Sequence, residues 1–132
     1  MAGDIEWMKD VACERIFRMC SVEGGFIMAG ERSGNIFLAR ADCSGNMLWE
    51  KEFGAGTGIS VFSDGEEYLL GGENGDGNPV VCRIGSDGSL IRRIALEGDG
   101  WVEAISKYNE RIVLARHVPE PRERTEIILI DF

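Results

Sequence analysis

Short apolar runs alternate along the chain with polar turns that contain glycine. One example is the run 36–39, which leads into the turn 44–46 and then into a second apolar run around Trp49. This pattern is typical of β-hairpins, because glycine adopts the positive φ values that tight turns need. No segment has a strong helical pattern; residues 14–19 come nearest, and they fall at a position where the rest of the chain predicts a strand. The sequence therefore predicts an all-β chain.

The pattern repeats with a period of about 42 residues. Residues 3–9 match residues 45–51, and the turn glycine Gly45 has its counterpart in Gly88. Apolar runs recur at 25–31, at 67–73 and, more weakly, at 111–117. A repeat of this kind is one supersecondary unit that buries its apolar faces against its neighbours.

We predict a single domain, residues 1–132, of three units with four strands each. The expected strands of the first unit, about 14–53, are 14–22, 25–31, 36–42 and 47–53. Those of the second unit, about 58–97, are 58–63, 67–73, 79–85 and 89–97. Those of the third unit, about 101–131, are 101–107, 110–117 and 125–131. The third unit lacks a fourth strand, and residues 4–10 match that missing strand in sequence.

The segment Gly24–Gly54 resembles the β-propeller repeats of many bacterial and archaeal proteins, which are WD-like and related to the pyrroloquinoline-quinone type. The similarity rests on four short stretches: 25–30, Gly45-Asn46, Trp49-Glu50-Lys51 and Phe53-Gly54. It covers about the whole chain and is strongest in the first unit. The resemblance implies a β-propeller of four-stranded blades, but no particular activity.

The same resemblance implies a role for two tryptophans. In these repeats the tryptophan of the fourth strand packs between neighbouring blades, and we expect Trp49 and Trp7 to do so. The second unit has Arg92 at this position, so its junction with the third unit departs from the family pattern.

Three blades are too few to close around an axis, because closed propellers have about four to eight. We therefore predict a homodimer that forms a six-bladed ring, in which the strand at 4–10 completes the third blade of the partner. This exchange would also cover an open strand edge. The alternatives are a β-trefoil that closes as a monomer, a half-ring completed by a different protein, and a fragment of a larger protein.

Net charge and cysteine content limit the classes of partner and the cellular location that we expect. The net charge is −9, from 14 Lys and Arg against 23 Asp and Glu, which argues against binding to nucleic acid. No apolar run reaches the roughly 20 residues that span a bilayer, and the first ten residues lack a signal-peptide pattern. The four cysteines are irregularly spaced, and we expect reduced thiols and a cytoplasmic location.

No catalytic residue, cofactor or metal site is predicted. The single histidine has no readable partner, and the cysteines form no C-x-x-C pair. The glycine-rich segment Gly54–Gly58 precedes no helix, so we interpret it as a turn between units rather than a phosphate loop.

The candidate ligand-binding residues lie on loops expected at one end of the units. They are Arg32, Asn74, Asp76, Trp101, Arg116 and His117. The leading functional hypothesis is a non-catalytic binding or scaffold module. The alternative is a propeller hydrolase or lyase acting on a small sugar or lactone, which would need carboxylates, a histidine or a metal at the axis.

Overall fold

The computed structural model describes residues 3–132, in which there are ten β-strands and no helix. This confirms the predicted all-β class. The strands are β1 (Arg15–Val22), β2 (Gly25–Arg32), β3 (Asn35–Asp42), β4 (Met47–Ser63), β5 (Glu67–Asn74), β6 (Pro79–Gly85), β7 (Leu90–Ala95), β8 (Trp101–Tyr108), β9 (Arg111–Val118) and β10 (Arg124–Ile130). Their bounds follow the ranges expected from the repeat closely, with two exceptions, at β4 and at residues 4–10.

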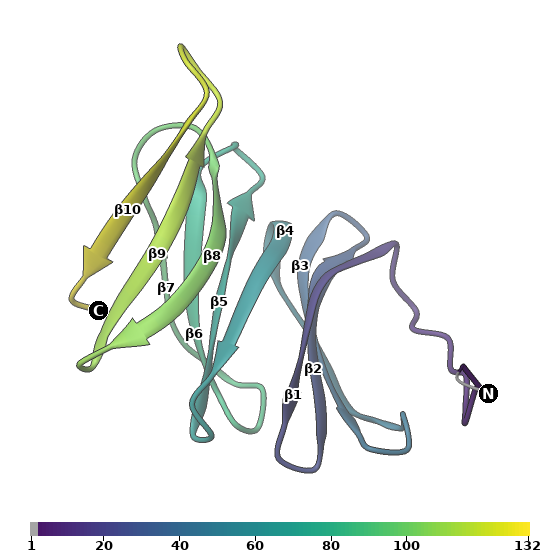
Figure 1. Ribbon diagram of the computed structural model, residues 1–132. Coiled ribbons are helices and arrows are strands. Elements are labelled where there is room, and N and C mark those ends of the chain that lie inside the picture. Colours follow the sequence, from purple (N-terminus) through teal and green to yellow (C-terminus); the bar gives the residue numbers. More distant parts are fainter. Residues whose placement is uncertain (1–2) are drawn as a thin grey trace.

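Every strand pairs antiparallel with the next one along the chain, and the pairs fall into three groups. The first sheet contains β1, β2, β3 and the first half of β4, and the second contains the rest of β4 with β5, β6 and β7. The third sheet contains only β8, β9 and β10, with β10 at its edge. The sheets stand face to face like the leaves of a fan (Figure 1). All are open, so their pairing gives no support to a closed trefoil barrel.

The strand β4 differs from prediction. Two strands separated by a turn at Gly54–Gly58 were expected, but one strand runs through this segment and passes from the first sheet into the second. Gly56 makes this possible: its φ is +137°, and a Cβ there would lie 2.0 Å from the carbonyl oxygen of Glu73. The turn prediction was wrong because a glycine-rich bend inside a strand has the same composition as a turn.

Hairpin turns in the first two sheets are fixed by polar side chains that cap the backbone. Asp42 Oδ1 accepts hydrogen bonds from the N–H groups of Ser44 and Asn46, both at 2.9 Å. These bonds to the charged form lower the pKa of Asp42, the bond from Asn46 being the largest cause. The turn between β6 and β7 uses Asp87 in the same way, through a 3.0 Å bond from Ser89 N–H. The repeated turn sequence therefore sets the strand register.

The apolar core is divided between the faces of the sheets. The first and second sheets enclose one cluster, whose largest members are Ile27, Ile36, Leu38, Phe53, Tyr68, Leu70 and Ile84. The second and third sheets enclose another, which contains Leu69, Val81, Val102, Ile105, Ile112 and Leu114. Neighbouring residues of one strand thus face different partners: Leu70 packs toward the first sheet and Leu69 toward the third. Burial on both faces explains why the second strands of the first two units read as continuous apolar runs.

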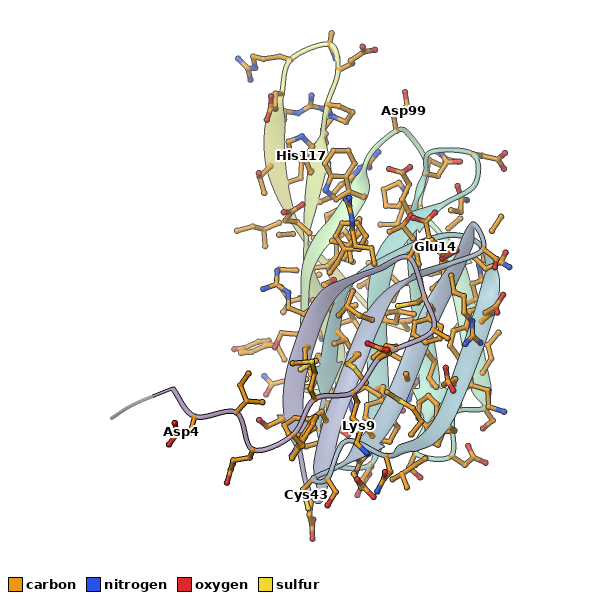
Figure 2. All side chains as sticks on the ribbon, turned by 90° about the vertical axis from the view of Figure 1, so that its right-hand side faces the viewer. Asp4, Lys9, Glu14, Cys43, Asp99 and His117 are labelled. Carbon is orange, nitrogen blue, oxygen red and sulfur yellow. The ribbon has the colours of Figure 1, made fainter. Side chains whose placement is uncertain are left out.

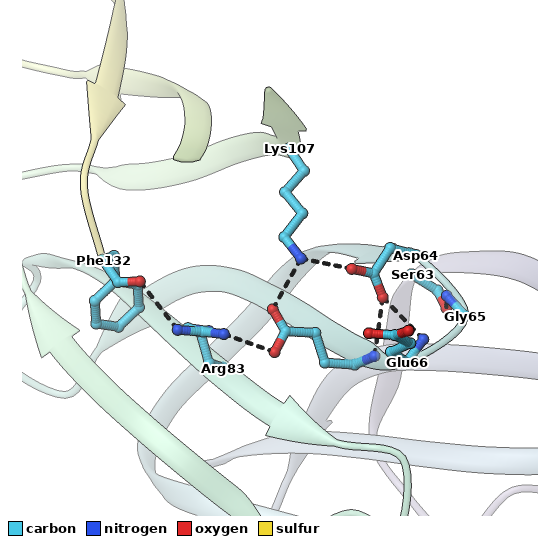
Figure 3. A network of polar contacts seen from close by, with 8 residues as sticks. Ser63, Asp64, Gly65, Glu66, Arg83, Lys107 and Phe132 are labelled. Atoms are coloured by element: carbon cyan, nitrogen blue, oxygen red, sulfur yellow. Dashed lines mark hydrogen bonds and ion pairs between the residues drawn. The ribbon is translucent and has the colours of Figure 1, made fainter. Parts of the chain in front are cut away.

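A polar network joins the second and third sheets (Figure 3). Lys107 Nζ on β8 lies 2.5 Å from Asp64 Oδ2 and 3.2 Å from Glu67 Oε1. Glu67 Oε2 accepts a hydrogen bond at 2.8 Å from Arg83, which also donates at 3.0 Å to the carbonyl oxygen of Phe132. Arg92 completes this junction, because its guanidinium carbon lies 4.7 Å from the centroid of the Phe132 ring. The unit without a fourth-strand tryptophan is therefore joined to its neighbour by ion pairs and a cation–π contact.

The N-terminal segment is the second difference from prediction. Residues 4–10 form no strand within a single chain; they lie against the outer face of the first sheet, far from β10 (Figure 1). The Trp7 and Phe26 rings have centroids 6.3 Å apart, and a Cβ on Gly45 would lie 2.6 Å from Trp7 Cζ3. One repeat later, Trp49 packs on the matching residues.

The contact made by Trp49 crosses from the first sheet to the second. Its ring centroid lies 5.9 Å from that of Tyr68, and a Cβ on Gly88 would lie 3.0 Å from Trp49 Cδ2. Tyr68 and Gly88 are the repeat counterparts of Phe26 and Gly45. The outer strand of the first sheet packs on the second sheet through Trp49. The N-terminal segment packs on the first sheet through Trp7 in the same way.

Candidate ligand-binding site

The candidate site lies where the first strands of the three sheets come together. These strands are β1, the second half of β4, and β8, and β4 contacts both of the others. They form the inner edges of the fan, and the remaining strands of each sheet extend away from them (Figure 1).

All three inner strands carry a β-bulge at matching positions. The ladder skips Phe17 in β1, Ile59 in β4 and Glu103 in β8. These residues lie one repeat apart. A bulge takes one residue out of the ladder and re-aims its side chain. The repeat thus presents one aromatic, one aliphatic and one acidic side chain at the same level of the three inner strands.

These bulged residues line a pocket with a volume of about 350 Å³. The rest of its lining comes from Thr57, Glu73 and Trp101. Phe17 is 41% exposed, so an aromatic side chain is open to solvent on an inner strand. Apolar walls with a few convergent polar groups are typical of small-molecule sites.

Two carboxylates give the pocket its charge. Glu103 accepts a hydrogen bond from the indole N–H of Trp101. Glu73 makes no ion pair with the part of the chain that the structure describes, and burial raises its pKa above the usual range. The carboxylate form of such a group is poorly solvated and has no ion-pair partner, so a cation beside it would stabilise it.

Two basic side chains pack on aromatic residues of the pocket. Arg15 lies over Phe17, with its guanidinium carbon 5.4 Å from the ring centroid. His117 stacks on Trp101 with ring centroids 4.4 Å apart and an interplanar angle of 22°. His117 Nε2 also lies 3.7 Å from Glu123 Oε1, in the loop between β9 and β10.

The structure brings two of the predicted site residues together, and a third is their neighbour on β9. Trp101 and His117 face each other across the β8–β9 ladder, and Arg116 is the next residue on β9. Arg116 donates a 3.0 Å hydrogen bond to the carbonyl oxygen of Asp99, while its buried Nε has no partner among the described residues. Figure 2 shows Asp99, Glu14 and His117 toward the same end of the molecule, opposite Cys43 and Lys9.

The other three predicted site residues lie at or just after strand ends: Arg32 ends β2, Asn74 ends β5, and Asp76 is in the turn that follows β5. Arg32 is held by ion pairs of 2.9 Å to both Glu50 and Glu52. Asn74 Oδ1 caps its own turn by accepting from the N–H groups of Asp76 and Asn78, at 2.9 and 3.0 Å. The side chain of Asp76 is exposed. We therefore assign Arg32 and Asn74 to supporting the local structure.

Sequence reasoning missed most of the residues that line the pocket. Phe17, Ile59 and Glu103 differ in chemistry, so no motif connects them. Their equal spacing in the repeat was the available signal, but a bulge cannot be read from residue types. Trp101 is the one pocket residue that was predicted.

Within residues 3–132, no group of three or more His, Cys, Asp or Glu side chains is arranged to hold a metal ion. The same residues include no helix with the length and apolar character needed to cross a membrane.

Comparison with solved structures finds chains of similar fold. No protein-family model matches the chain, and no curated protein sequence matches it. A similar solved structure is BamB from Moraxella catarrhalis, with a TM-score of 0.48 and 18% sequence identity. The similarity covers 74% of this chain and 27% of that one, so the chain spans about a quarter of the length of BamB.

Proposed function

We propose that the chain is a non-catalytic binding or scaffold module with β-propeller architecture. Two chains form one six-bladed ring, and each lends residues 4–10 to the third sheet of the other. A rigid ring with loops and a pocket at its axis binds partners without needing catalytic groups. The observation that carries the proposal is the placement of Trp7.

The placement of Trp7 supports strand exchange. Trp7 contacts Phe26 and Gly45. Trp49, on the outer strand of the first sheet, makes the equivalent contacts with Tyr68 and Gly88. Trp49 belongs to the fourth strand of one sheet and packs on the next sheet of the ring. By the same rule, a strand that packs on the first sheet through Trp7 is the fourth strand of the sheet before it. Within one chain no such sheet exists, so the third sheet of a second chain is the natural candidate.

The free faces of the two terminal sheets support the same assembly. The third sheet leaves one face uncovered, where Ile127 is 81% and Leu129 47% exposed. These residues pair across the ladder with Ala115 and Val113. The second sheet has an equivalent face, which includes Leu69 and Val81. The third sheet covers that face.

The complementary surface lies on the first sheet. Met28, Ala39 and Ala41 are buried there under Val11, Cys13 and Met47 rather than under another sheet. Their counterparts in the second sheet are Leu70, Cys82 and Ile84, which pack against a whole sheet. The third sheet of a second chain would provide the missing layer, and it would also bring β10 beside the exchanged strand.

The decisive experiment is light scattering after gel filtration. We expect a mass near twice the 14.5 kDa of the chain. Deleting residues 1–10 removes the exchanged strand, and we expect it to yield monomers. The charged variant Ile127→Glu tests the free face of the third sheet and should also dissociate the dimer.

The matched control is Ile91→Glu, because Ile91 is 55% exposed on β7 of the second sheet and lies on neither of the two surfaces proposed to meet. This variant should keep the mass of the unaltered protein. A monomeric unaltered chain would contradict the dimer. A dimer that survives the deletion would contradict strand exchange while leaving a different dimer in place.

A further inference from the structure

The chemistry of the pocket between the inner strands identifies a class of ligand. Its walls are Phe17, Ile59 and Trp101, and its polar groups are the carboxylates of Glu73 and Glu103. We propose that this pocket binds a small organic molecule that carries an ammonium group on an apolar body. Aromatic faces and carboxylates together favour a cation, whereas an anion would meet repulsion from both.

A contact within the protein shows that the pocket wall accepts a cation. The guanidinium carbon of Arg15 lies 5.4 Å from the centroid of the Phe17 ring. Arg15 makes no ion pair with the described part of the chain, so it is placed there without a carboxylate partner. Arg15 is exposed and does not itself line the pocket. A ligand cation would therefore meet Arg15 as a nearby like charge and not as an occupant of the pocket.

The volume limits the size of the ligand. A pocket of about 350 Å³ lies near the lower end of the usual range for small-molecule sites, which is about 300–1,000 Å³. This suits an aryl or short alkyl group with one ammonium and excludes a folded partner. The net charge of −9 adds a long-range attraction for cations and none for anions.

This inference does not depend on the ring, because a single chain supplies all the lining residues. In a ring of two chains, two such pockets would face the same axis. A mass measurement on each sample used for binding keeps the two proposals separate. A monomer that binds the ammonium ligand would contradict the dimer alone.

The test uses the full chain and three probes: phenethylammonium, its neutral counterpart 2-phenylethanol, and methyl glucoside. Binding is followed by calorimetry and by the NMR shift of the Trp101 indole N–H. We expect phenethylammonium to bind at least about five times more tightly than 2-phenylethanol at low salt, and this preference should shrink as salt is added. Methyl glucoside should not bind measurably.

Variants locate the site. We expect Glu73→Gln to weaken phenethylammonium binding by about five-fold and Phe17→Leu by about three-fold. We expect Arg15→Gln to strengthen it by about two-fold, because a positive charge beside the Phe17 wall that repels the ligand is removed. Glu66→Gln is the matched control, since it removes one carboxylate from an exposed turn at the other end of β5.

Three results would overturn the proposal. One is equal affinity for the charged and neutral probes, and another is tighter binding of the glucoside. The third is an equal loss on Glu66→Gln and Glu73→Gln, which would mean general attraction to an acidic protein. Circular dichroism checks the fold of each variant; if one is unfolded, the probe pair and its salt dependence on the unaltered protein still decide.

Discussion

Trp49 packs edge-on against Tyr68, with ring centroids 5.9 Å apart and an interplanar angle of 63°. The two residues belong to different sheets: Trp49 lies in the first half of β4 and Tyr68 on β5. Edge-to-face pairs of this kind add stability beyond the area they bury. This pair joins the outer strand of one sheet to the core of the next, and the same geometry at Trp7 supports the proposed exchange.

Trp49→Ala should destabilise the fold. The indole is half-buried, so we expect a loss of about 2–3 kcal/mol, somewhat below the usual cost of removing a fully buried tryptophan. Urea unfolding followed by circular dichroism measures it. Leu48→Ala is the control, because Leu48 is 57% exposed and should cost much less. An equal loss in both variants would argue against the contact between sheets as the cause.

Trp7→Ala should act on assembly more than on the fold. Trp7 is 44% exposed in a single chain and belongs to no strand, so its removal should cost the isolated chain about 1 kcal/mol or less. If Trp7 lies between sheets of two chains, the same change should shift the dimer toward monomer at low concentration. Gel filtration over a dilution series measures the shift, and Trp7→Phe should show a smaller one.

The network around Lys107 predicts a dependence of stability on acid. Burial alone would raise the pKa of Asp64, but hydrogen bonds from Lys107 and from the N–H groups of Glu67 and Glu66 lower it to about 2. A carboxyl group with a lowered pKa contributes stability above its unfolded pKa of about 4, and this contribution is lost as the pH falls toward 2.

The variant Asp64→Asn tests this dependence. After a discount for the solvent access of the pair, we expect Asp64 to contribute about 1 kcal/mol at pH 6 and almost nothing at pH 2. Urea unfolding at several pH values should show that the free energy of unfolding falls less steeply toward acid pH in the variant. An equally steep fall in the variant and the unaltered protein would mean that other groups cause the acid sensitivity.

Gly71→Ala should disturb the packing of the second and third sheets. A Cβ at Gly71 would lie 2.4 Å from Val102 Cγ1, and Val102 is fully buried. Overpacking of this kind costs about 1–3 kcal/mol. Gly85→Ala is the control, because the nearest atoms to its Cβ are side-chain oxygens at 3.1 and 3.2 Å. Thermal unfolding of both variants compares them.

The thiols should differ in reactivity. Burial raises the pKa of Cys82 to about 11, so very little of its reactive thiolate is present at pH 8. Cys43 is exposed in a hairpin turn. Alkylation by iodoacetamide, followed by mass spectrometry of peptides, should label Cys43 in minutes and Cys82 only after unfolding. Rapid labelling of Cys82 in the folded protein would contradict its burial.

The sequence by itself determined the strands and their order. Alternation of apolar runs with glycine turns is a local property, and repetition at Gly45 and Gly88 reinforces it, so the bounds of most strands could be predicted. The match between residues 3–9 and 45–51 also identified the N-terminal segment as a sequence repeat of the outer strand of the first unit, although residues 4–10 form no strand within one chain. These features depend on neighbours in the chain, which a sequence displays directly.

Only the tertiary structure decided how the strands meet. The continuous course of β4 and the three bulges arise where sheets converge, and residue types alone do not distinguish a bend from a turn. The pocket joins Phe17, Ile59 and Glu103, which share no motif and come together because the inner strands pack side by side. Arg32 illustrates how far contacts depend on packing: it ends β2, yet its ion pairs are with two glutamates on β4, two strands away in the sheet. Contacts between distant segments depend on how sheets pack, and that packing is set by the whole chain.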